Sequence, residues 1–157
     1  MRKRIIEKAR DAAASAEDDW LKLEDLADVE VTSESADHPI EDALLPGRTS
    51  GWRAAASGQQ TIRLLFSHPQ PLRRISLSFD EPLVERTQEY VLRWSPDSGR
   101  SYRDVVRQQW NFSPRGATSE TEDHRVALPA VTVLELSITP DTSGGSAVAS
   151  LARLRLA

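Results

Sequence analysis

The feature that most constrains this chain is a repeated alternation of apolar and polar residues from about residue 29 to the C-terminus. In one run Ile62, Leu64 and Phe66 fall on one face, while Thr61 and Arg63 fall on the other. A period of two places one face of a strand in a core and the other in water, which is typical of antiparallel sheets. The alternation recurs at Val29 and Val31; at Ile75, Leu77 and Phe79; at Tyr90, Leu92 and Trp94; at Val106, Gln108, Trp110 and Phe112; at Val126 and Leu128; at Leu134, Leu136 and Ile138; and at Ala152, Leu154 and Leu156.

Residues that favour turns separate these runs. They occupy positions 68–71, 80–82, 95–99, 113–116 and 143–146, which are rich in Pro, Gly, Asp and Ser. About eight short strands without intervening helices predict a mostly β domain, an antiparallel β-sandwich of the jelly-roll type. One short helical turn is expected at residues 40–45, because the preceding proline suits the start of a helix.

Residues 2–26 have a different composition and are predicted to form an α-helix. They contain no Gly or Pro and are rich in Ala, Glu, Lys and Leu. We therefore divide the chain into an N-terminal amphipathic helix, residues 1–27, and a β-sandwich domain, residues 28–157. The apolar residues of the helix recur every three or four positions, at Ile6, Ala9, Ala13, Ala16, Trp20, Leu23 and Ala27.

This apolar stripe has two interpretations. It can dock on the chain's own sandwich, or it can form the seam of a coiled coil with a second copy. The charges of the helix oppose its own dipole, since Arg2 and Lys3 lie at the positive end and Glu24 and Asp25 lie toward the negative end. Two antiparallel copies would place basic ends against acidic ends, so we expect a homo-oligomer that forms through this helix.

Composition excludes several classes of site. The chain of 157 residues has no cysteine, which rules out disulfides and zinc–thiolate centres. Its net charge of −4 argues against nucleic acid as a partner, because phosphate contacts need clustered cationic side chains. His38, His68 and His124 are far apart in the sequence and lack the spacing of metal ligands, so we expect no bound metal.

Motifs that carry catalysis are missing as well. The sequence has no glycine-rich phosphate loop and no G-x-S-x-G nucleophile elbow. Carboxylates such as Glu120 and Glu122 could in principle form a hydrolytic pair, but charged loop ends are the commoner explanation. We therefore expect no enzymatic activity, no catalytic residue and no cofactor.

The N-terminal residues do not match a signal peptide. The opening residues MRKR are basic, but Glu7 and Lys8 interrupt the apolar run that would have to follow them. We find no segment that is long and apolar enough to cross a bilayer. We therefore expect a cytoplasmic protein without a membrane partner.

Several stretches between about residues 29 and 157 resemble the discoidin or coagulation-factor type C family. Residues 43–52 read ALLPGRTSGW, where the family typically has an alanine, then Asp-Gly, a threonine and a tryptophan. Residues 60–66 and 72–79 are similar to the family's paired strands with a short polar break. Residues 90–102, YVLRWSPDSGRSY, are similar to its strand that is followed by S-x-D-G and an aromatic residue. The C-terminal strand pair also fits.

The family has a galactose-binding-like jelly roll, which many carbohydrate-binding modules share. The resemblance implies a binding module that contacts glycans, lipids or proteins through loops at one end. Many members hold a calcium ion partly through the Asp of the Asp-Gly pair, and this position is Pro46 here. Acidic residues beside the last strand are replaced by ASLA at residues 149–152. Both changes remove hard oxygen ligands, so the resemblance does not carry the calcium site over.

Residues 103–114 combine two aromatic residues with amides and arginines, the most unusual composition in the chain. Amides and guanidinium groups can hydrogen-bond sugar hydroxyls, and a tryptophan face packs against the C–H face of a pyranose ring. Residues 86–89 and 52–53 have a similar character. The predicted ligand-binding residues are Arg53, Arg86, Gln88, Arg107, Gln109, Trp110 and Asn111.

A second interpretation places the aromatic side chains in the scaffold. Trp110 and Phe112 share their parity with Val106, so both can belong to the core, as we expect for Trp52 and Trp94. The predicted function is a non-catalytic binding module with a carbohydrate as the expected ligand. The alternative is a cytoplasmic protein-interaction or assembly domain that oligomerises through its N-terminal helix, since intracellular relatives of this fold act as scaffolds.

Overall fold

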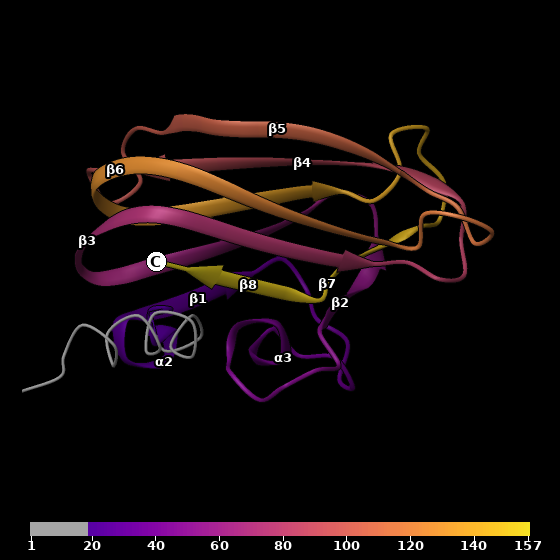
Figure 1. Ribbon diagram of the computed structural model, residues 1–157, viewed down its shortest axis with the longest axis horizontal. Coiled ribbons are helices and arrows are strands. Elements are labelled where there is room, and N and C mark those ends of the chain that lie inside the picture. Colours follow the sequence, from indigo (N-terminus) through magenta and orange to yellow (C-terminus); the bar gives the residue numbers. More distant parts are fainter. Residues whose placement is uncertain (1–18) are drawn as a thin grey trace, which may run out of the picture.

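The computed structural model describes residues 19–157. Most of the predicted N-terminal helix, and with it the predicted oligomer seam, lies outside the described residues and stays a prediction. Within residues 19–157 no helix is long and apolar enough to span a membrane. The order of elements is α2 (Leu23–Leu26), β1 (Ala27–Val31), α3 (Glu41–Leu44), β2 (Trp52–Ser57), β3 (Gln60–Asp80), β4 (Arg86–Ser95), β5 (Arg103–Phe112), β6 (Ser119–Thr139), β7 (Val148–Leu151) and β8 (Arg153–Leu156) (Figure 1).

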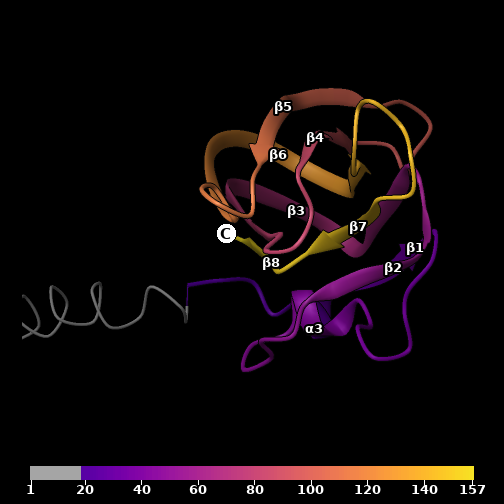
Figure 2. The ribbon, with the colours of Figure 1, turned by 90° about the vertical axis from the view of Figure 1, so that its right-hand side faces the viewer.

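The strands form two packed layers, and every pairing between them is antiparallel. One layer has the order β1, first half of β3, second half of β6, β4 and β5. The second half of β3, with the first half of β6 and β8, forms the opposite layer. A two-stranded sheet of β2 and β7 adjoins this layer (Figure 2). The predicted antiparallel β-sandwich is confirmed.

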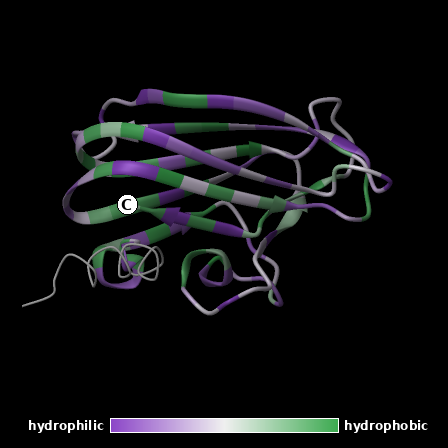
Figure 3. Cartoon of the chain, viewed as in Figure 1, coloured by the Kyte–Doolittle hydropathy of each residue, from purple (hydrophilic) through white to green (hydrophobic). Residues whose placement is uncertain are grey.

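The core lies between the layers and is built by the predicted alternation. Figure 3 shows hydrophobic and hydrophilic residues alternating along the strands. The apolar residues of β3, β4 and the second half of β6 point inward, and the largest fully buried side chains include Trp52, Phe79, Tyr90 and Phe112. Trp94 is also buried, as predicted. The short helical turn predicted at residues 40–45 is confirmed as α3.

The predicted turn at residues 68–71 is wrong, because β3 continues through it. The pairing of β3 with β6 persists at Gln70 and Leu72, with register shifts on either side. Irregular pairing of this kind bends a strand without ending it, and exposed prolines are tolerated at such positions. The runs predicted near residues 126–128 and 134–138 likewise form one strand, β6. The strands β2 and β7 were not predicted.

The predicted helix over residues 2–26 is not continuous at its C-terminal end. Residues 19–22 are not helical, and the backbone N–H of Leu21 donates to the carbonyl of Leu156 at the end of β8. Leu23 is buried in the chain's own core, and the guanidinium of Arg74 lies 4.5 Å from the Trp20 ring centroid. Ala27, predicted to end the helix, opens β1. For these residues the apolar stripe therefore docks within the chain.

Candidate functional site

A pocket of about 460 Å³ lies beside β5, which is the last strand of its layer. Its walls come from Gln109, Trp110 and Asn111 of β5 and from Ala117 in the loop that leads to β6. Because β5 pairs with β4 along one side, its other side is open to a ligand. The structure thus brings together three of the seven side chains that the sequence predicted as a binding site.

Hydrogen bonds on the outer face of β4 and β5 fix the two amides of this pocket. Gln109 Nε2 donates to Glu89 Oε2 at 3.0 Å, and Thr87 Oγ1 donates to Asn111 Oδ1 at 2.7 Å. Arg107, another predicted site residue, forms an ion pair with Glu89 on the same face. The bonds from Gln109 and Arg107 lower the pKa of Glu89. Glu89 therefore stays ionised at neutral pH and holds both side chains in place.

Arg86 and Gln88 do not lie at the surface, so their predicted role as surface ligand contacts does not fit the structure. Their exposed fractions are 3% and 1%, because they share the inward parity of Tyr90 on β4. Arg86 Nε donates to Glu81 Oε1 at 2.9 Å, and Arg86 Nη1 donates to the carbonyl of Pro140 at 2.6 Å. Gln88 is paired directly with Trp110, and Arg86 with Phe112, so both side chains lie on the strand next to the one that lines the pocket.

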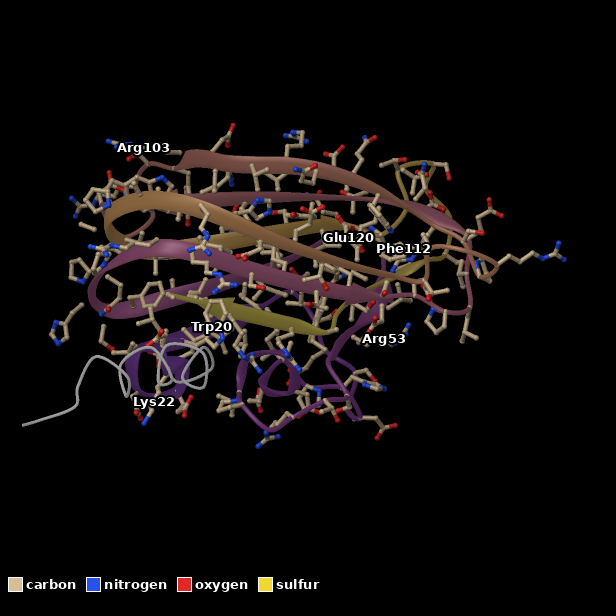
Figure 4. All side chains as sticks on the ribbon, viewed as in Figure 1. Trp20, Lys22, Arg53, Arg103, Phe112 and Glu120 are labelled. Atoms are coloured by element: carbon tan, nitrogen blue, oxygen red, sulfur yellow. The ribbon has the colours of Figure 1, made fainter. Side chains whose placement is uncertain are left out.

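The structure does not bring Arg53 to the pocket. Arg53 belongs to β2 and pairs with Ser150 of β7, in the separate two-stranded sheet. Figure 4 shows Arg53 on a different layer from Phe112, which ends the strand that carries the pocket. Its predicted role as a ligand contact therefore finds no support in the geometry.

A polar cluster faces the core beside the pocket, and the sequence analysis missed it. Glu120, Glu122 and His124 of β6 pair with Phe79, Leu77 and Ile75 of β3, all of which are buried, so the three side chains point between the layers. With Arg86, Gln88, Tyr90 and Trp110 from the opposite layer they form what we call the inner polar cluster. The Tyr90 hydroxyl and His124 Nε2 lie 2.7 Å apart and are hydrogen-bonded.

Glu120 and Tyr90 are strongly perturbed members of the inner polar cluster. Glu120, labelled in Figure 4, is buried, with an exposed fraction of 4%. Burial together with the neighbouring Glu122 raises the pKa of Glu120 to about 8. The pKa of Tyr90 is also raised, first by burial and then by the charges of Glu122 and Glu120. Both acids share the inward face of β6 with His124, which is hydrogen-bonded to the Tyr90 hydroxyl.

Several buried polar atoms of the inner polar cluster have no hydrogen-bond partner among the described residues. They are Arg86 Nη2, Gln88 Nε2, Trp110 Nε1 and both carboxyl oxygens of Glu120. An unsatisfied buried polar group costs about 1–3 kcal/mol, so such atoms are rarely left alone in a folded protein. Donors and acceptors that gather around one half-buried tryptophan are suited to a ligand that carries hydroxyl groups.

One signal in the sequence could have revealed this cluster. Glu120, Glu122 and His124 share the parity of Val126 and Leu128 on one strand. Polar residues at core-facing positions are unusual, because burying them is costly unless they have a function or a partner. The sequence analysis instead assigned the carboxylates to loop ends.

Comparisons of the sequence with known families identify no relative. The sequence matches no protein-family model, and no curated protein matches it. The fold, in contrast, matches solved structures. The family 32 carbohydrate-binding module of NanJ from C. perfringens, solved in complex with galactose, has a TM-score of 0.62 at 14% identity, covering 87% of this chain and 96% of that one.

Two further structures show the same likeness. The carbohydrate-binding module of AlyQ in complex with 4,5-unsaturated mannuronic acid has a TM-score of 0.62 at 14% identity, with coverage of 84% and 95%. A chain in the structure of reduced XRCC1 bound to the DNA pol beta catalytic domain has a TM-score of 0.61 at 15% identity, also with coverage of 84% and 95%. This chain has the galactose-binding-like fold. The resemblance to discoidin-type domains is confirmed at the level of the fold.

Proposed function

We propose that this chain is a non-catalytic carbohydrate-binding module whose ligand packs against Trp110 in the pocket beside β5. The observation that carries the proposal is a half-buried tryptophan between two amides, Gln109 and Asn111, at the open edge of a sheet. The volume of about 460 Å³ falls in the range of small-ligand sites.

The polar groups around Trp110 support a sugar rather than an apolar ligand. Gln109 is oriented through Glu89, and among the described residues its carbonyl oxygen has no hydrogen-bond partner. The same holds for the amide nitrogen of Asn111. One acceptor and one donor therefore lie in the same pocket wall as the tryptophan, on the outer face of the strand whose inner face carries Trp110. Groups of this kind suit the hydroxyls of a sugar.

The fold adds support but does not assign the function by itself. The modules of NanJ and AlyQ were solved with galactose and with 4,5-unsaturated mannuronic acid. The structure with the DNA pol beta catalytic domain shows that the fold also occurs in a protein complex. The site at Trp110, and not the fold, is the reason for proposing a sugar ligand here.

Titration calorimetry against a panel of neutral and charged oligosaccharides tests the proposal. We expect binding of at least one oligosaccharide, and loss of that binding in Trp110→Ala. Arg53→Ala is the matched control, because Arg53 belongs to the separate sheet and should leave the affinity unchanged. Circular dichroism of each variant checks that it is folded. Absence of binding across the panel at millimolar concentration would contradict the proposal.

A further inference from the structure

The buried carboxylates of this chain differ in how they are neutralised. Glu81 is buried and pairs with Arg86 at 2.9 Å. Glu135 is buried on the outer face of the sheet and is bound by two guanidinium groups, those of Arg63 and Arg93. Glu120 is as buried as these two, yet neither of its oxygens has a partner among the described residues. The inner polar cluster therefore contains a buried acid without a cation.

A second acidic residue, Glu122, lies next to Glu120. Glu122 is two residues along the same strand and faces the same way, close enough for its carboxyl group to affect the pKa of Glu120. Two carboxylates at short range in a poorly solvated site cannot both stay ionised without a positive neighbour. Arg86, in the same cluster, forms its ion pair with Glu81 and binds Pro140 and Gln88, and among the described residues no ion pair joins it to Glu120.

The acid pair lies next to the proposed sugar pocket. Glu120 and Glu122 share the inward face of β6 with His124, the hydrogen-bond partner of the Tyr90 hydroxyl. Tyr90 is adjacent on the inner face of β4 to Gln88, the direct partner of Trp110. Trp110 takes part in both features, since it lines the pocket and its Nε1 atom is buried without a partner. Glu122 and Trp110 are half-buried, so the cluster is partly exposed to solvent, and Trp110 also lines the pocket.

We infer that Glu120 and Glu122 form a subsite for the ammonium group of an amino sugar whose ring packs against Trp110. Below pH 8 Glu120 carries a proton in the free chain, and a bound ammonium group would displace that proton to solvent and supply the cation that the two acids lack. The unpartnered N–H groups of Gln88 and Trp110 would donate hydrogen bonds to hydroxyl oxygens of the same sugar. This inference rests on the proposed carbohydrate-binding function and names the class of sugar.

The test compares two tetrasaccharides with the same backbone by titration calorimetry at pH 6. One is the β-1,4-linked glucosamine tetramer, which carries ammonium groups, and the other is its fully N-acetylated form, which carries none. We expect the wild-type chain to bind the amine form at least tenfold more tightly. Glu120→Gln should abolish this preference while it retains binding of the acetylated form.

Two further variants separate a specific subsite from a general charge effect. Asp104→Asn removes one negative charge from the exposed part of the same β5 strand and should keep the full preference. Glu122→Gln, which alters a less buried side chain than Glu120→Gln, should also reduce the preference and guards against a folding defect in the first variant.

The outcomes distinguish this inference from the function on which it rests. Equal affinity of the wild-type chain for the two tetrasaccharides overturns the amino-sugar subsite and leaves the carbohydrate-binding proposal in place. A preference that persists in both Glu120→Gln and Glu122→Gln also overturns the subsite. Binding of neither tetrasaccharide, nor of any sugar in the wider panel, overturns both.

Discussion

The hydroxyl of Tyr90 and the Nε2 atom of His124 are 2.7 Å apart and join the two layers of the sandwich by a hydrogen bond. Tyr90 belongs to β4 in one layer, and His124 belongs to the first half of β6 in the other. The raised pKa of Tyr90 keeps its hydroxyl protonated throughout the neutral range. This contact is therefore available to stabilise the closed arrangement around the inner polar cluster.

Tyr90→Phe should destabilise the fold modestly. The substitution keeps the buried ring, which packs on Phe79 with centroids 5.3 Å apart, and removes only the hydrogen bond. A hydrogen bond of this kind contributes about 1 kcal/mol, and for a chain of this size that lowers the Tm by roughly 2–4 °C. In a double-mutant cycle, His124→Ala should lower the free energy of unfolding by less in the Tyr90→Phe background than in the wild type. If the effects of the two substitutions are additive, the contact contributes nothing to stability.

Stability should fall as the pH rises from 5 to 8.5. The folded pKa of Glu120 is about 8 and its unfolded value is 4.5, so between these values the native state binds more protons than the unfolded state. Stability must then decrease with increasing pH. Asp97 does not add to this dependence. Its pKa is lowered from 3.8 to about 2, so the stability that it contributes is complete above pH 3.8 and is lost only at lower pH.

Glu120→Gln tests the origin of that pH dependence. The variant lacks the titrating group, so its Tm should change less between pH 5 and pH 8.5 than the Tm of the wild type. At pH 8.5 we expect Glu120→Gln to be more stable, relative to the wild type, than it is at pH 5. A wild-type Tm that is constant or rises over this range would show that Glu120 titrates normally.

Trp94→Ala and Asn111→Ala should have very different effects on folding. Trp94 is 6% exposed and packs in the core, and truncation of such a side chain costs about 3–5 kcal/mol. Asn111 is exposed and makes one hydrogen bond, to Thr87, so its removal should leave the Tm nearly unchanged. Urea titration of both variants gives the comparison, and equal midpoints would refute the assignment of the inner and outer faces of these strands.

Added calcium should leave the Tm unchanged. Among residues 19–157 no group of three or more His, Asp and Glu side chains is placed to hold a metal ion. Where the resembled family uses an aspartate, this chain has Pro46. A ligand that binds the native state alone would raise the Tm, and the rise would continue to grow with the logarithm of the ligand concentration above its Kd. A rise of several degrees with millimolar calcium, reversed by a chelator, would reveal a site that the sequence argument missed.

The alternation of apolar residues was sufficient to predict the sandwich, because a strand with one buried face has apolar residues at every second position. Ile62, Leu64 and Phe66 all point inward as expected. The bends of β3 and β6 could not be predicted from this pattern. In β3, for example, prolines at residues 69 and 71 favour a turn and an exposed bend equally well. Strand β2 was missed because its outer half lacks apolar residues that point to a core.

The candidate site was predicted in part, and the reason lies in strand parity. Trp110 and its neighbouring amides were found because their residue types are unusual together. Arg86 and Gln88 were assigned to the surface from their polarity, although their positions in the alternation match those of buried Tyr90. Their burial depends on Glu81 and Pro140, which approach from other parts of the chain, and no local pattern predicts such partners.

The bends of β3 and β6 also determine how the two layers are connected. Each strand runs through both layers, so the layers are joined by continuous backbone at the end of the sandwich where Leu72 and Val131 are buried. The inner polar cluster lies toward the opposite end, where β5 ends and β6 begins (Figures 1 and 4). The layers are therefore joined by backbone at one end, whereas the hydrogen bond between Tyr90 and His124 joins them through side chains within the cluster. A ligand that enters the cluster would meet side-chain contacts between the layers rather than continuous backbone.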